Sequence, residues 1–148
     1  MRAECFFRVD AVDVEYPNVR TTESVDGGVV TRVCETPRGV LTSRTRIMPH
    51  IGTDMEFEHM VKGVGDLAVC RSLYEDAVYR PRYELVRRQI KRMGDTGVTS
   101  IFGPPTPLLD LVMFQIRLPL IHYLVADSPR EMPELLEAMH RRNCDYAR

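Results

Sequence analysis

The chain has 148 residues, of which 44% are hydrophobic and 28% charged, and this composition is typical of one globular domain. The net charge of −1, from 20 basic and 21 acidic residues, removes the usual electrostatic argument for a nucleic-acid or membrane partner. No apolar run approaches the roughly 20 residues of a membrane helix. Arg8 and Asp10 interrupt the first apolar stretch, so we expect no signal peptide and a cytoplasmic location.

Four cysteines are spread along the chain, at Cys5, Cys34, Cys70 and Cys144. No two of them have the spacing of a zinc knuckle or of a CxxC redox motif. We therefore expect reduced, mostly buried thiols, with neither a disulfide framework nor a metal site.

The first half of the chain predicts strands. Residues 5–9 and 11–15 are short apolar stretches. Residues 29–34 and 40–46 are rich in β-branched residues and flank a turn that contains Pro37 and Gly39. This pattern predicts a β-hairpin over residues 29–46, at the periphery because neither of its faces is cleanly apolar.

After residue 52 the pattern changes to that of helices. Thr53 and Glu56 form a capping-box pattern that predicts a helix over 54–62, and a second helix is predicted over 66–75. Apolar residues then recur at spacings of three and four through residues 80–93, which predicts an amphipathic helix.

The last third predicts one strand followed by helices. A short, buried apolar strand is expected at 98–102, and apolar helices are expected over 107–115 and 118–126. Ser128, followed by Pro and then by Glu three residues after the Ser, predicts the start of a final helix over 129–146. That helix has no stop signal before Arg148, so we expect the chain to be part of a longer one. The helix–turn–strand order predicts an α/β protein.

Three clusters of residues are weak candidates for a functional site. His140 and Cys144 are four residues apart on the last predicted helix and could present two metal ligands, although an ordinary helix surface is the favoured interpretation. The glycine-rich segment 62–66 matches no phosphate-binding motif and is interpreted as a turn. The basic residues of segment 80–92 are interpreted as the solvated face of a helix.

One loop has a position that suggests a ligand site. Phe102, Gly103, Pro104, Pro105 and Thr106 follow the predicted strand and lead into an apolar helix. In parallel α/β proteins, loops at the carboxyl ends of strands form the ligand-facing rim. We expect this loop to bind substrate, with a rigid connector as the alternative.

Four segments, in this order, give the chain a resemblance to a known family. It resembles the uroporphyrinogen decarboxylase-like family, which includes the decarboxylase and corrinoid-linked methyltransferases. The segments are Thr36-Pro37-Arg38-Gly39, then Val61-Lys62 with Gly65-Asp66-Leu67, then Val98 through Pro105, and finally Leu124 through Leu136 with Asp127-Ser128-Pro129-Arg130-Glu131.

The resemblance implies a fold and an activity. It implies that residues 1–148 form a single partial domain, an incomplete (β/α)8 TIM-barrel segment with a β-hairpin excursion. The parent enzyme would act on a tetrapyrrole or a related small molecule without a cofactor. The decarboxylases' Arg-Gln-Ala-Gly-Arg motif is absent, and Leu111 stands where they have a Tyr. No catalytic residue therefore carries over, and we expect the chain alone to be inactive.

Two alternatives remain. The parent could be a methyltransferase that uses zinc and a corrinoid, although the family's His-x-Cys zinc motif has no counterpart here. The chain could instead be a non-catalytic module that associates with another copy of itself, because an incomplete barrel exposes strand edges and apolar faces.

Overall fold

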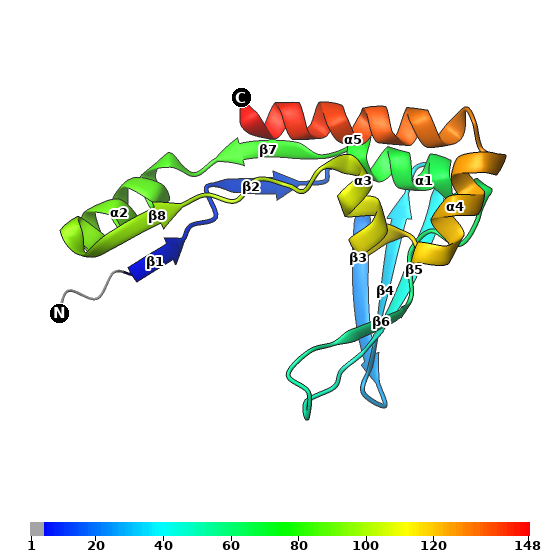
Figure 1. Cartoon of the computed structure of the whole chain (residues 1–148), viewed down its shortest axis with the longest axis horizontal. Coiled ribbons are helices and arrows are strands. Elements are labelled where there is room, and N and C mark those ends of the chain that lie inside the picture. Colours follow the sequence, from blue (N-terminus) through cyan, green and yellow to red (C-terminus); the bar gives the residue numbers. More distant parts are fainter. Residues whose placement is uncertain (1–4) are drawn as a thin grey trace.

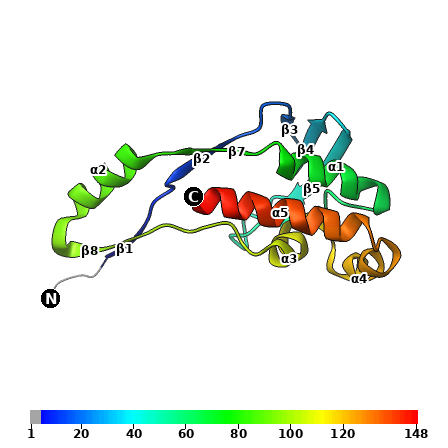
Figure 2. The same cartoon turned by 90° about the horizontal axis from the view of Figure 1, so that it is seen from above.

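The computed structural model describes residues 5–148, and it has an elongated shape with a helical body at one end (Figures 1 and 2). Its strands are β1 (Cys5–Arg8), β2 (Val12–Glu15), β3 (Arg20–Asp26), β4 (Val29–Thr36), β5 (Gly39–Arg46), β6 (Met55–Glu58), β7 (Val78–Pro81) and β8 (Gly97–Ser100). Its α-helices are α1 (Val64–Glu75), α2 (Tyr83–Met93), α3 (Pro107–Asp110), α4 (Leu118–Asp127) and α5 (Glu131–Ala147). Two short turns of other helix types complete the list, the 3₁₀ turn η1 (Gly94–Thr96) and the π-helical turn η2 (Leu111–Gln115).

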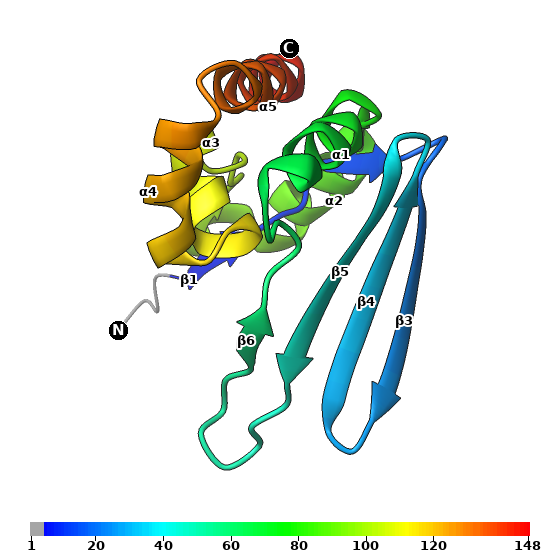
Figure 3. The ribbon, with the colours of Figure 1, turned by 90° about the vertical axis from the view of Figure 1, so that its right-hand side faces the viewer.

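The predicted hairpin is confirmed and forms the centre of a larger sheet. Strands β3, β4, β5 and β6 pair antiparallel in that order, and the sheet projects away from the helices (Figure 3). At one end of the hairpin the Thr36 hydroxyl donates to the Gly39 carbonyl and accepts from the Arg38 amide, which fixes the turn. At the other end Gly27 and Gly28, both with positive φ, connect β3 to β4.

The predicted helix over 54–62 is wrong, because this segment contains strand β6. Its residues pair with β5, with Arg46 opposite Met55 and Arg44 opposite Glu58. The Thr53 hydroxyl contacts the carbonyl of Asp54 and caps no helix. Apolar and acidic residues alternate in Met-Glu-Phe-Glu, and this strand period outweighed the capping pattern once a neighbouring strand edge was available.

The prediction of an incomplete (β/α)8 barrel is also wrong. The described strands form three separate sheets of two, two and four strands, and no barrel closes. Among them β1 and β8 pair in parallel, whereas β2 and β7 and the four-stranded sheet are antiparallel. The reason is that most strands come from turn-linked or ribbon-forming segments, which pair with antiparallel neighbours instead of alternating with helices.

The amphipathic segment 80–93 is partly helical. Helix α2 begins at Tyr83, and the residues just before it form strand β7, which pairs with β2. None of the residues of α2 is buried, and Tyr83 and Ile90 of the predicted apolar face are exposed. The predicted strand 98–102 begins at Gly97 and ends at Ser100, and Val98 is 66% exposed. The predicted burial of this strand is therefore wrong.

The helices near the C-terminus lie close to their predicted positions. Helices α3 and α4 and turn η2 occupy the two predicted apolar segments, and α5 begins two residues later than predicted. The Ser128 side chain caps nothing; its carbonyl accepts a hydrogen bond from the Met132 amide. None of the helices within residues 5–148 combines the length and the apolar character that crossing a membrane requires.

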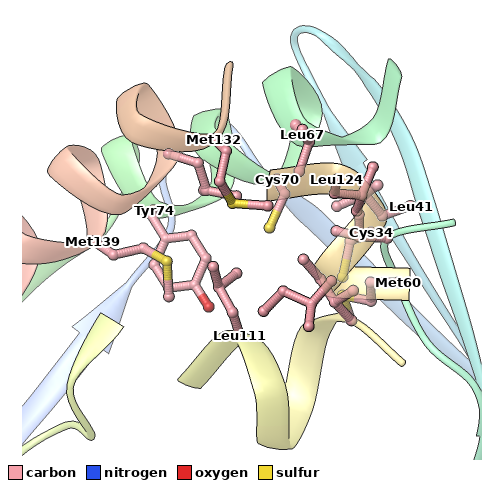
Figure 4. Packing of buried hydrophobic residues seen from close by; sticks show 14 residues of the cluster. Cys34, Leu41, Met60, Leu67, Cys70, Tyr74, Leu111, Leu124, Met132 and Met139 are labelled. Carbon is pink, nitrogen blue, oxygen red and sulfur yellow. The ribbon is translucent and has the colours of Figure 1, made fainter. Parts of the chain in front are cut away.

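The core lies between the helical body and the inner face of β4 and β5 (Figure 4). Helix α1 packs against α5, and Arg71 of α1 pairs with Glu134 of α5 at the edge of their contact. Cys34 and Cys70 are buried in this core as free thiols, Cys144 is half-buried, and the side chain of Cys5 lies outside the described residues. The fully buried side chains are those of Leu41, Val61, Leu67, Cys70, Leu111, Ile116, Ser128, Leu135 and Met139.

A candidate ligand-binding loop

The loop that the sequence suggested lies where two parallel strands end. Strands β1 and β8 run side by side, with Arg8 opposite Ser100, and the Val9 amide donates to the Ser100 carbonyl at 3.0 Å. Residues 101–106 then continue without regular structure to α3. The carboxyl ends of both strands therefore open onto this loop, although the strands belong to a two-stranded sheet and not to a barrel.

An aromatic ring and a guanidinium group come together at this point. The Phe102 side chain is 52% exposed, and the guanidinium carbon of Arg8 lies 5.1 Å from the centre of its ring. Phe6 meets the same ring edge to face, with the ring centres 6.2 Å apart. Asp10 is 3.6 Å from Arg8, but both side chains are well exposed and such a pair is weak. The cluster offers a flat apolar surface with a positive charge at its side.

Helix α5 holds the loop in place from behind. The Tyr146 hydroxyl donates to the Phe102 carbonyl at 2.9 Å, and the Asn143 amide donates to the Pro105 carbonyl at 2.8 Å. Gly103 has no positive φ, and a Cβ there would lie at an ordinary contact distance of 3.7 Å from Tyr146. The loop is thus fixed by side chains of α5 and by its prolines, and glycine at residue 103 is not needed for its conformation.

A half-buried arginine connects α5 to its neighbours under the loop. The Arg142 guanidinium donates to the Tyr79 hydroxyl at 2.6 Å and to Asp110 at 3.2 Å, and it lies over the Tyr74 ring. Burial raises the pKa of Tyr79, while the positive charge of Arg142 acts against this shift. Burial also raises the pKa of Tyr74, and the negative charge of Asp110 adds to the effect. Both tyrosines therefore stay neutral partners of the ion pair at physiological pH.

The residues that support the loop were not predicted from the sequence. Tyr146 and Asn143 lie on α5, more than thirty residues beyond the loop, and no local motif connects them to it. The one signal was the polar character of the end of α5, which a surface helix also has.

Two of the other candidates do not form a site: His140 and Cys144 lack a third metal ligand among the described residues, and segment 62–66 has a structural role. His140 Nε2 lies 3.6 Å from Cys144 Sγ, and within residues 5–148 no group of three or more His, Cys, Asp or Glu side chains could hold a metal ion. In segment 62–66, Asp66 accepts a hydrogen bond from the Lys62 amide, so this segment begins α1.

Half of the basic residues of segment 80–92, three of six, form ion pairs. Arg80 pairs with Glu15 and Arg82 with Asp13, across the β2–β7 ribbon. Arg87 pairs with Glu84 one turn away on α2. This distribution agrees with a solvated face.

Comparisons with known proteins add no relative: no family model, no curated protein and no solved structure matches the chain.

Proposed function

We propose that this chain is part of a uroporphyrinogen decarboxylase-like enzyme of the cytoplasm, which acts on a tetrapyrrole or a related carboxylated substrate. In this proposal the loop from Phe102 to Thr106 forms part of the substrate site. The observation that carries the proposal is the pairing of the exposed Phe102 ring with Arg8 at the carboxyl ends of β1 and β8.

The chemistry of the cluster suits such a ligand. A pyrrole ring is flat and apolar on its faces, so it can stack on or meet the Phe102 ring. The carboxylate side chains of a tetrapyrrole project from the ring edge, where Arg8 can form charge-assisted hydrogen bonds. Because α5 fixes the loop through the Phe102 and Pro105 carbonyls, little conformational entropy is lost on binding.

The order of the four sequence segments supports the same family. The described strands do not form the family's barrel, so the groups that would hold the remaining carboxylates and protonate the product are not assembled here. We therefore expect substrate binding by this chain but no decarboxylation by the chain alone.

A zinc- and corrinoid-dependent methyltransferase is not favoured by the side chains present. His140 and Cys144 are the one His–Cys pair that the described residues bring together, and a catalytic zinc ion requires three protein ligands. The described residues therefore do not fit this metal.

The test is a titration with uroporphyrin III, a stable fluorescent octacarboxylate, followed by fluorescence quenching. We expect saturable binding that Arg8→Gln weakens by about 1.5–3 kcal/mol, because a hydrogen bond to a charged group is lost. Phe102→Leu keeps the apolar volume but removes the flat ring, and we expect it to weaken binding by about 1 kcal/mol.

Arg38→Gln is the matched control, because Arg38 is also exposed but lies in the β4–β5 turn of the four-stranded sheet. It should leave the affinity unchanged. Equal affinities for the parent chain, Arg8→Gln and Phe102→Leu would show that the loop is a connector. The absence of uroporphyrin binding would count against the proposed substrate class.

A further inference from the structure

A hollow lies between β6 and the start of α4, away from the loop from Phe102 to Thr106. It has a volume of about 550 Å³, and its walls include Phe57, His59, Lys62, Arg117, Leu120 and Tyr123. The Val61 amide donates to the Gln115 carbonyl at 3.0 Å, and Val61 and Ile116 form a parallel bridge. This bridge draws the end of β6 toward the beginning of α4, as Figure 3 shows. The volume of the hollow lies within the range of about 300–1,000 Å³ that is usual for small-molecule sites.

The hollow carries an excess of positive charge. Glu58 is the one carboxylate in its wall, and it lies 3.2 Å from Lys62 and 3.9 Å from Arg44. Lys62 also donates to the Thr42 carbonyl at 2.6 Å. Arg117, in contrast, forms no ion pair with any residue within 5–148. Its guanidinium group is therefore available to an anion from outside the chain.

The Phe57 ring extends this positive region. The guanidinium carbons of Arg44 and Arg46 lie 5.3 and 5.7 Å from the centre of the ring. Both cations lie beside the Phe57 ring, although neither lines the hollow and Arg44 is also paired with Glu58.

The remaining wall combines apolar surface with an unsatisfied polar atom. Tyr123 is exposed although it is a large aromatic residue, and Leu120 lies half-buried beside it. The Nδ1 atom of His59 is buried and has no hydrogen-bond partner among the described residues.

We propose that this hollow binds a small organic anion with a flat apolar body, such as an aromatic carboxylate. The body lies against Tyr123 and Leu120, and the anionic group faces Arg117. The inference does not depend on the proposed tetrapyrrole site, because no residue of the loop from Phe102 to Thr106 lines the hollow.

The test uses two probes of the same shape, 2-naphthoate and the neutral 2-naphthamide, and measures affinity by calorimetric titration of the full chain. We expect naphthoate to bind at least about tenfold more tightly, because one charge-assisted hydrogen bond distinguishes the two probes. Arg117→Gln should remove this difference while leaving naphthamide binding unchanged. Tyr123→Ala should weaken both probes, since it removes part of the apolar wall.

Arg88→Gln provides the matched control, because Arg88 is an exposed arginine of α2 that forms no ion pair with a described residue. It should change neither affinity, and amide chemical-shift changes on naphthoate addition should centre on His59 and Leu120. The proposal is overturned if both probes bind equally, if Arg117→Gln has no effect, or if naphthoate does not bind. Loss of uroporphyrin binding in Arg8→Gln with intact naphthoate binding would separate the two sites.

Discussion

At the scale of single residues, the most demanding environment is that of Arg142. Its side chain is 16% exposed and Asp110 is 9% exposed, so both charges have lost most of their water. In exchange, Arg142 donates hydrogen bonds to Asp110 and to the Tyr79 hydroxyl, and the Tyr74 ring covers the face of its guanidinium group. Removing one partner of such a pair usually costs about 3–5 kcal/mol, because the other charge stays buried alone. Arg142 therefore connects α5 to α3 and β7.

Because of the Cys70 thiol, we expect the stability of the fold to fall at alkaline pH. Burial, with smaller effects from the charges of Asp110 and Asp66, raises the pKa of its thiol to about 12. The unfolded chain loses this proton near the ordinary pKa of about 8.5, whereas the folded chain keeps it. The free energy of unfolding should therefore fall as the pH rises from about 8.5 to 12, by at most about 5 kcal/mol from this one group.

The measurement is urea unfolding of the parent chain and of Cys70→Ala at several pH values from 7 to 11. At pH 7 the variant should be less stable by about 1 kcal/mol, because it loses buried volume. This difference in the free energy of unfolding should disappear or change sign by pH 11, since the variant has no thiol to ionise at residue 70. Parallel curves over the whole range would contradict the assigned pKa.

The sequence suggested the Phe102–Thr106 loop as a candidate site. It predicted neither the Arg8 guanidinium group beside the Phe102 ring nor the side chains of α5 that hold the loop. The loop stood out because it follows a predicted strand and leads into an apolar helix, and that is a local signal. Arg8 and Tyr146 reach it through pairing of β1 with β8 and through the docking of α5. Those contacts depend on tertiary structure, which residue spacing does not encode.

At the scale of elements, the close approach of the hairpin to α1 depends on one glycine. Gly39 has φ near +148°, and a Cβ at this position would lie 3.0 Å from Val69 Cγ2 of α1. We expect Gly39→Ala to lower the free energy of unfolding by about 2 kcal/mol, because it combines a strained backbone with crowding.

Gly65→Ala serves as the comparison. Gly65 lies inside α1, its φ is not positive, and a Cβ there meets nothing within 4 Å. Alanine favours a helix over glycine, so this variant should gain about 0.5 kcal/mol in chemical denaturation. If both variants lose stability equally, the packing of Gly39 against Val69 is not the cause.

Elements with a complete local signal were predicted well, and those defined by a distant partner were not. The β4–β5 hairpin, α4 and α5 each contain their own turn or apolar period. Strands β6 and β7 are short and became strands because β5 and β2 offered them an edge. Strand β3 was not predicted, although Gly27-Gly28 after Asp26 is a strong hairpin signal.

At the scale of the whole molecule, the β1–β8 pair leaves one apolar face uncovered. Phe6 and Val98 are register partners on this face, and each is 66% exposed. Parallel sheets in proteins are nearly always covered on both faces. Helix α2 covers the other side, near Phe7.

We expect the purified chain to associate with itself through this face. Light scattering after size exclusion should give a mass that rises above 17.0 kDa as the concentration increases. The double substitution Phe6→Ser with Val98→Thr should move the equilibrium toward the monomer by at least about tenfold, since a buried aromatic side chain contributes well over 1.4 kcal/mol. Val25→Thr, at an equally exposed apolar position of β3, is the control and should have no effect. A monomer at every concentration would contradict this expectation.

The parallel pairing of β1 with β8 also sets an order of events during folding. Cys5 pairs with Gly97, so this contact closes a chain loop that contains the whole four-stranded sheet, α1 and α2. Closing a long loop has a higher entropic barrier than closing the two-residue turns of β3–β4 and β4–β5. The antiparallel sheet and the helical body can therefore assemble early. We therefore expect the end of the molecule that carries Arg8 and Phe102 to form last, and the proposed substrate site to appear only after the rest of the fold.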